Sequence, residues 1–372
     1  MTPIGVMRNN RGLNRKAMKA FVFMAFLILL TACALNPADK PNPLYWPPPP
    51  AEPYIVHEAT LRAEADIRKV TLEDKLRDFS STISAADQAN VFTKPYDVVA
   101  KKGLVVVSDT LAGHVLVFDT QRGKVYRIGW RLEGKLRSPL GVALDGELNI
   151  YVADGGRNQV LVYDRLGLFL RAIGEQQKLA RLSDVAVTED GRSVYLLDRG
   201  GVESDWHRVL LYNSEGSFQR VIGKRGSGDG EFNHPVSMAV NSEGDLYVLD
   251  SGNFRVQQFE PNGQYLKSWG RPGRLMGDFA RPRAMAIDRQ NNVYVTDGAF
   301  QNFQIFNSQG QLLLPVGVGG MAHRPGVFAL PAGISVEETD RIFVVDQIQR
   351  KIDVFRLLNP DERQNIVNFR AE

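Results

Sequence analysis

The sequence predicts an all-β fold, a six-bladed β-propeller of four-stranded blades, preceded by a short N-terminal helix and a proline-rich tether. One pattern returns six times between Pro95 and Phe355. Each copy holds short apolar runs separated by Gly, Asn and Asp, which is typical of strands joined by tight turns. An aspartate ends the second strand of every copy: Asp109, Asp154, Asp198, Asp250, Asp297 and Asp346. These aspartates are 44 to 52 residues apart, a period typical of propeller blades.

Residues 1–33 predict a lipoprotein signal peptide. Five basic residues and no acidic residue accompany the apolar run Phe21–Leu30, which is too short to span a bilayer. The run leads into Leu30-Thr31-Ala32-Cys33, which resembles a bacterial lipobox, so we expect Cys33 to be lipidated. Cys33 is the only cysteine, which excludes disulfides and a catalytic cysteine elsewhere. Because Ala34 replaces the aspartate of inner-membrane lipoproteins, the resemblance implies an outer-membrane anchor, facing the periplasm or the cell surface.

The next segments link this leader to the repeats. Residues 34–53 are rich in proline, which favours polyproline II and predicts a semi-rigid tether. The sixth repeat shows only three strands, and an open blade would expose a sheet edge. We therefore expect residues 54–61 to supply its outermost strand. Residues 71–83 have helical apolar spacing and predict a short capping helix within the segment 54–94. The propeller itself is expected over 95–358, with a C-terminal tail over 359–372.

The repeats resemble the NHL repeat. The clearest copy, Pro139 to Gly174, reads PLGVALDGELNIYVADGGRNQVLVYDRLGLFLRAIG, and it contains the P-x-G-V-A and Y-V-A-D segments of that repeat. The glycine-rich link from Ile222 to Phe232 matches as well. Six copies in register make the resemblance specific for the fold, but a propeller fold does not fix an activity.

The start of each inner strand predicts what lines the central channel. The second residue after each repeat proline, or its equivalent, forms one column: Asp97, Gly141, Asp184, Ser237, Ala284 and Gly333. We expect Asp97 and Asp184 to lie in the channel with Arg283. Two histidines, His234 and His323, precede inner strands, whereas a zinc site needs three or four ligands.

We therefore expect no catalytic residue, no metal and no other cofactor. The alternative is a metal-dependent propeller enzyme of lyase or lactonase type. The resemblance implies it, because peptidyl-hydroxyglycine lyases of this fold use a histidine-bound metal and gluconolactonase-type propellers use acidic and amide ligands.

Charge is distributed unevenly over the predicted propeller. Without residues 1–33 the chain keeps 40 Lys and Arg against 42 Asp and Glu, which does not favour nucleic-acid binding. The loops that join blades, and those between the second and third strands, share one face and are rich in basic residues. We expect this face, called the link face below, to surround the channel mouth and to bind a partner. The expected contact residues are Arg157, Arg225, Arg271, Arg274, Arg281 and Arg283.

These observations favour a noncatalytic envelope lipoprotein that acts as a docking scaffold. The expected partners are the membrane, through the N-terminal lipid, and an acidic protein or anionic envelope polymer; nucleic acid is not expected, and the propeller is expected to be monomeric. The order of lipobox, Trp46 with its prolines, and propeller also resembles bacterial NHL lipoproteins encoded beside multihaem c-type cytochromes. That resemblance implies a supporting role in an electron-transfer or secretion assembly. The chain has no C-x-x-C-H motif for c-type haem.

Overall fold

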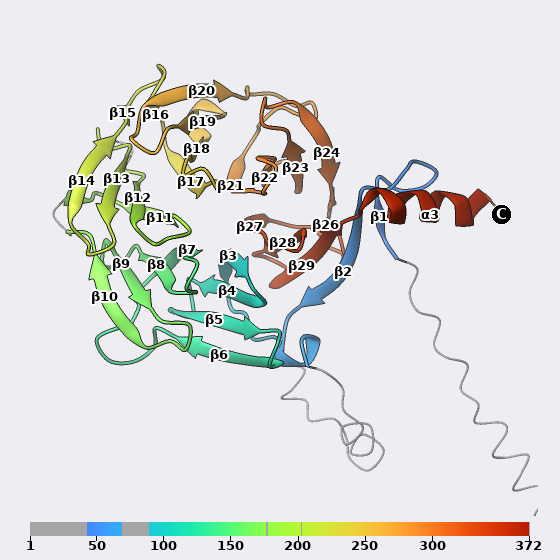
Figure 1. Ribbon diagram of the computed structural model, residues 1–372, viewed down its shortest axis with the longest axis horizontal. Helices are drawn as coiled ribbons and strands as arrows, with labels where there is room; N and C mark the ends of the chain where they lie inside the picture. Colours follow the sequence, from blue (N-terminus) through green and yellow to red (C-terminus); the bar gives the residue numbers. More distant parts are fainter. Residues whose placement is uncertain (1–42, 69–88, 176–177, 202, 372) are drawn as a thin grey trace, which may run out of the picture. The chain divides into compact units, whose positions relative to one another are not determined.

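The six repeats form six separate sheets around a central channel, as Figure 1 shows for the computed structural model. The structure describes residues 43–68, 89–175, 178–201 and 203–371. Leu44–Glu372 forms one compact unit that contains every blade. The predicted all-β, six-bladed fold is confirmed.

From the inner to the outer strand, the six blades are β3 (Pro95–Lys101), β4 (Leu104–Asp109), β5 (His114–Asp119) and β6 (Lys124–Ile128); β7 (Pro139–Leu144), β8 (Ile150–Asp154), β9 (Gln159–Tyr163) and β10 (Phe169–Ile173); β11 (Leu182–Val187), β12 (Ser193–Asp198), β13 (Arg208–Asn213) and β14 (Phe218–Ile222); β17 (Pro235–Val240), β18 (Leu246–Asp250), β19 (Arg255–Phe259) and β20 (Tyr265–Trp269); β21 (Pro282–Ile287), β22 (Val293–Asp297), β23 (Asn302–Phe306) and β24 (Leu312–Val316); β27 (Pro331–Val336), β28 (Arg341–Asp346), β29 (Lys351–Leu357) and β2 (Ile55–Leu61).

The repeat aspartates hold the chain where each link enters an inner strand. Pro139, for example, pairs with Asp154 across the first two strands, and the register shifts directly after the proline. The two residues before the proline, Arg137 and Ser138, donate their backbone N–H groups to the Asp154 carboxylate, both at 2.8 Å. The same bonds reach Asp109 from Thr93 and Lys94. These carboxylates therefore satisfy backbone donors that the ladder cannot pair.

A second set of equivalent residues anchors each link by burying an apolar side chain. The residue three positions before each inner strand is apolar and buried: Phe92, Leu136, Leu179, Phe232, Phe279 and Phe328. Some links are also stiffened by short strand pairs of their own; β15 (Lys224–Arg225) pairs with β16 (Glu231–Phe232), and β25 (Val318–Gly319) with β26 (Val327–Phe328). The links are thus anchored structures rather than loose connections.

The N-terminal strand closes the ring in the position expected from the sequence. β2 pairs antiparallel with β29, from Ile55 opposite Leu357 to Leu61 opposite Ile352. Figure 1 shows this blue strand against the red last blade. Ile55 and Leu61 are buried in the cores on either side of that blade.

The predicted tether is too long at its C-terminal end. β1 (Tyr45–Trp46) adds a fifth strand outside β2, and the Trp46 ring packs edge-on against Phe355 with centroids 5.3 Å apart. Residues 44–53 therefore belong to the propeller, because a large aromatic ring and a buried Pro53 give this proline-rich segment an apolar surface to cover.

Two predictions about helices have different outcomes. The predicted tail 359–372 contains a helix, α3 (Pro360–Ala371), and the side chain of Asn359, just before it, accepts the backbone N–H of Glu362. The predicted helix over 71–83 lies outside the described residues. No helix in the described ranges is both long and apolar enough to cross a membrane.

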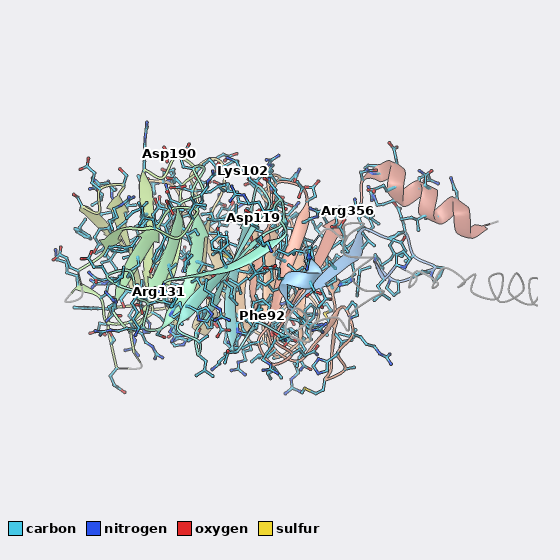
Figure 2. All side chains as sticks on the ribbon, turned by 90° about the horizontal axis from the view of Figure 1, so that it is seen from below. Phe92, Lys102, Asp119, Arg131, Asp190 and Arg356 are labelled. Atoms are coloured by element: carbon cyan, nitrogen blue, oxygen red, sulfur yellow. The ribbon has the colours of Figure 1, made fainter. Side chains whose placement is uncertain are left out.

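The alternating strand directions give the ring two distinct faces. The link face carries the links and the turns between second and third strands; the opposite face, called the turn face, carries the remaining turns. Figure 2 shows Arg131 of the first link on the other side of the ring from Lys102 and Asp190 of the turn face.

Candidate functional site: the central channel and the link face

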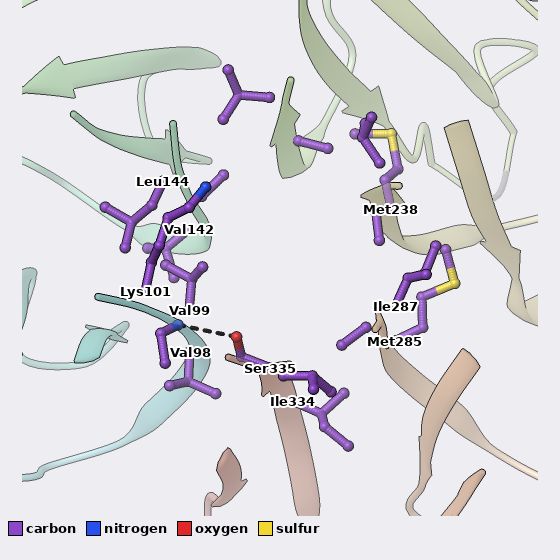
Figure 3. A pocket seen from close by; sticks show the side chains of 18 of the residues that line it. Val98, Val99, Lys101, Val142, Leu144, Met238, Met285, Ile287, Ile334 and Ser335 are labelled. Atoms are coloured by element: carbon purple, nitrogen blue, oxygen red, sulfur yellow. Dashed lines mark hydrogen bonds between the residues drawn. The ribbon is translucent and has the colours of Figure 1, made fainter. Parts of the chain in front are cut away.

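The channel is wide at the turn face and nearly closed at the link face. The wide part has a volume of about 430 Å³ and is lined by inner-strand side chains such as Val99, Val142 and Ile334. Figure 3 shows these apolar side chains around the opening, with Ser335 accepting the backbone N–H of Ala100 at 3.0 Å. The part nearer the link face has about 20 Å³. The wider opening of the channel therefore lies on the turn face, whereas the sequence placed the channel mouth on the link face.

Three side chains of the inner column bond their blade to the next one. The Val142 N–H donates to Asp97 Oδ2 at 3.0 Å, and the Met238 N–H donates to Asp184 Oδ2 at 2.7 Å. On the same ring, Ser237 accepts the Met285 N–H at 3.3 Å. These bonds cross from one sheet to the next, so polar channel residues stabilise the packing of the blades.

The side chains of Asp97 and Asp184 both lie next to the backbone at Gly141 and Val142. A Cβ on Gly141 would lie 1.9 Å from Asp184 Oδ1 and 2.7 Å from Asp184 Cα, so only glycine leaves room for that carboxylate. Burial raises the pKa of Asp97 to about 7. Burial, followed by the negative charge of Asp97, raises the pKa of Asp184 as well. The pair therefore resists full ionisation near neutral pH.

Two arginines lie near the half-buried Tyr96 at the narrow end of the channel. Burial raises the pKa of Tyr96, and the nearby Arg199 and Arg283 guanidinium groups oppose that shift. Burial lowers the pKa of both arginines, and Arg181 and Arg281 add positive charge beside Arg199 and Arg283 respectively. The Nε atoms of Arg199 and Arg283 are buried without a hydrogen-bond partner. Within the described parts of the chain, neither arginine has an ion pair, although Asp97 and Asp184 line the same end of the channel.

The histidines do not assemble a metal site. His234 lies beside His207, with ring centroids 6.4 Å apart, and donates its backbone N–H to His207 Nδ1 at 3.2 Å. Burial, then the charges of Arg199, His207 and Arg181, lower the pKa of His234. His323 is exposed on another link. The described residues contain no group of three His, Cys, Asp or Glu placed to hold a metal ion, and the cationic neighbours of His234 disfavour one there.

The six arginines expected to bind a partner have three different environments. Arg157 donates from Nη2 to the Lys135 carbonyl at 2.6 Å and so stabilises its blade. At the equivalent positions, Arg208 donates to the Lys178 carbonyl and Arg255 to the Gly228 carbonyl. Arg225 donates to the Ser204 carbonyl at 3.1 Å, and Arg271 donates to Asp278 at 2.6 Å. The other three are Arg274 and Arg281, both exposed, and Arg283, which is half-buried at the channel. The expected set is thus only partly free for a partner, and Cys33 lies outside the described residues.

The sequence-based prediction missed Arg199 as a member of this group. The signal was present in its column, because the residue after each repeat aspartate is otherwise small or uncharged. In three of those positions, Thr110, Ser251 and Gln347 donate to the carbonyl of the next blade's repeat proline. An arginine in this column breaks the pattern and extends beside the channel.

Comparison with known proteins agrees with this architecture. The NHL repeat model matches residues 136–163 and 232–259, two segments that begin at the buried link residues Leu136 and Phe232. NHL repeat-containing protein 3 of Mus musculus is 32% identical over 149 residues, which is 34% of this chain and 42% of that protein. Protein brain tumor of Drosophila melanogaster is 27% identical over 129 residues, 34% of this chain and 12% of that protein. The chain thus spans less than half the length of these relatives.

Solved structures share the fold at low sequence identity. A streptogramin B lyase structure superposes with a TM-score of 0.52 at 11% identity and covers 72% of this chain and 94% of that one. A gluconolactonase from Xanthomonas campestris gives a TM-score of 0.53 at 18% identity, covering 72% and 87%. Identities this low establish the fold alone. Six sheets in a ring make this chain a six-bladed β-propeller, and two of its blades contain segments that match the NHL repeat model.

Proposed function

We propose that this protein is a noncatalytic docking scaffold of the bacterial cell envelope whose link face binds an anionic partner. The observation that carries the proposal is the group of Arg199 and Arg283 around Tyr96, with Arg181 and Arg281 beside them. Partly buried guanidinium groups without a carboxylate partner are costly, and an anionic ligand would offset that cost. Long-range attraction from the same charges would also accelerate association.

The cellular placement follows from the leader. A lipid on Cys33 anchors the monomeric propeller to the outer membrane, with residues 34–43 as the spacer. The resemblance to NHL lipoproteins encoded beside multihaem cytochromes supports a role in an electron-transfer or secretion assembly. In such an assembly the propeller contributes binding and positioning, and the redox groups belong to its partners.

Removing two positive charges from the link face is expected to weaken binding to a polyanion at least about tenfold at low salt. The variant is Arg281→Ser with Arg283→Ser, and the probe is fluorescent poly-L-glutamate, titrated against the protein lacking residues 1–43. The matched control removes two exposed arginines of the turn face, Arg192 and Arg289, and so changes the net charge equally. Added salt should weaken wild-type binding, because exposed charges are screened. Equal losses in both variants would mean that net charge, not the link face, determines binding, and would refute the proposal.

The second candidate function, a metal-dependent enzyme of lyase or lactonase type, is favoured by one observation, the neighbouring carboxyl groups of Asp97 and Asp184 in the channel. The donors around them do not complete a transition-metal site, since Met238 and Val142 already donate to these carboxyl groups. Metal content of the purified protein, measured by mass spectrometry after dialysis without chelator, discriminates the two functions. We expect no stoichiometric zinc, copper or iron; a stoichiometric metal that disappears in Asp184→Asn would favour the enzyme.

A further inference from the structure

We propose that the link face docks on an anionic lipid bilayer, with apolar loop tips in the interfacial layer and arginines at the headgroups. This inference rests on the docking function proposed above and names its partner. An acidic protein or a soluble polymer satisfies the arginines but leaves exposed apolar side chains on the same face in water. A bilayer surface satisfies both.

Large exposed apolar side chains gather on the link face. Within the described ranges, nine of them lie on links or on loops between second and third strands: Leu111, Trp130, Leu132, Trp206, Leu275, Met276, Val318, Met321 and Ile348. Among the residues that the structure describes, the turns of the turn face carry three: Tyr54 between β1 and β2, and Leu166 and Leu168 between β9 and β10. Scattered apolar side chains are normal on a protein surface, but this unequal distribution marks an interaction surface.

These side chains are not misplaced core residues. Each link already buries its own apolar residue, such as Leu136 in the first link and Phe279 in the fourth. Leu132 has 91% of its surface exposed and a φ of 56°. A leucine in the left-handed region is uncommon and costs free energy, so the backbone holds this side chain outward at a cost. Such an arrangement gives a ligand a preformed apolar tip.

Basic side chains accompany the apolar tips. The guanidinium of Arg131 lies 3.3 Å above the Trp130 ring centroid, next to Leu132. Exposed Arg274 precedes Leu275 and Met276, and exposed Arg324 follows Met321 on the fifth link. Aromatic and basic side chains together are typical of protein segments that lie at the membrane interface. The tips come from several links around the ring, so the whole face can meet a flat surface.

Vesicle binding tests this inference on the protein lacking residues 1–43, which removes the predicted lipid anchor and keeps the complete compact unit. Vesicles of phosphatidylcholine are compared with vesicles containing about 30% phosphatidylglycerol. We expect binding to the anionic vesicles only. Leu132→Ser with Leu275→Ser and Met321→Ser is expected to reduce the partition coefficient roughly tenfold or more, because buried apolar area is lost. The control, Leu166→Ser with Leu168→Ser on the turn face, should bind like wild type.

The tryptophans report insertion directly. Trp130 and Trp206 are exposed on the link face, whereas Trp269 packs against Phe306 and Trp46 against Phe355. In a Trp206→Phe protein, phosphatidylglycerol with brominated acyl chains is expected to quench Trp130, and the same lipid without bromine is expected to shift its emission to the blue.

The outcomes separate this inference from the proposed function. Vesicle binding without quenching, unaffected by the three tip substitutions, would show simple electrostatic adsorption and overturn the bilayer inference. Binding of poly-L-glutamate without vesicle binding would overturn it in favour of an acidic protein or polymer, and the docking function would stand. Failure with both probes would refute both.

Discussion

Removing the closing strand is expected to lower the melting temperature of the propeller by at least about 10 °C. The comparison is between proteins lacking residues 1–43 and residues 1–68, which differ by β1, β2 and the short segment after them. β2 buries Ile55, Val56 and Leu61 at 9% exposure or less, and each such side chain contributes about 1.5–3 kcal/mol. Its loss also exposes the edge of β29, which then has unpaired backbone donors and acceptors.

A buried ion pair increases the effect of this deletion. Lys351 donates to Asp353 at 2.7 Å, and both side chains are fully buried in the last blade. Thr60 of β2 donates to the same carboxylate at 2.7 Å, and His57 lies 3.8 Å from it. Burial acts to raise the pKa of Asp353, but the interactions with His57, Lys351 and Thr60 outweigh it and lower that pKa. Without β2 the buried carboxylate loses two of its partners, which is costly in a low-dielectric interior.

Adding the missing segment back provides the control. A synthetic peptide of residues 44–68 should raise the melting temperature of the shortened protein in a concentration-dependent manner, because a ligand that binds only the folded state stabilises it. Equal melting temperatures for the two proteins, measured by circular dichroism, would show that the ring closes without this strand.

The fold was predictable because a repeat presents most of its structural signals five or six times. The proline at the start of the inner strand, the aspartate at the end of the second strand and the incomplete sixth repeat together specify blade number and closure. The segment from Leu44 to Pro53 was not predictable in the same way, because proline content predicts an extended chain but not the surface it covers. Trp46 packs on Phe355, a residue at the far end of the propeller sequence, and no local pattern encodes that contact.

The candidate site was only partly predictable. The inner column places Asp97 and Asp184 in the channel, since the strand period fixes which side chains point inward. Their shared environment around Gly141 depends on the distance between blades, which the sequence does not give. The roles of Arg157 and Arg271 differ from the prediction for a similar reason: a carbonyl or a carboxylate elsewhere in the folded link occupies each guanidinium.

Raising the pH from 5 to 8 is expected to destabilise the propeller through Asp97, by about 3 kcal/mol. The pKa of Asp97 rises from 3.8 to about 7 on folding. Between these values the folded state binds more protons than the unfolded state, so stability falls as the pH rises and becomes level above pH 7. Asp184 acts in the same direction. Urea unfolding midpoints across this pH range measure the effect.

Asp97→Asn isolates the contribution of Asp97 and Asp184 to the pH dependence of folding stability. An asparagine keeps the oxygen that accepts the Val142 N–H, but it cannot ionise, and it removes the charge that raises the pKa of Asp184. The variant should be more stable than wild type at pH 8, and the difference should shrink towards pH 4. Burial also raises the pKa of Asp250, which gives both proteins a slope in the same direction. The difference between the two proteins, rather than either profile alone, is therefore the relevant quantity.

The pH profiles of the wild type and Asp97→Asn also indicate how much positive charge the link face offers to a partner. A pair that retains a proton has less negative charge, so it neutralises less of the field of Arg199 and Arg283 at the narrow end of the channel. If the two proteins instead show parallel pH profiles, both carboxylates are ionised close to these arginines. The channel would then be an internally compensated charge cluster, and the positive charge available to an anionic partner would be limited to the exposed arginines of the links.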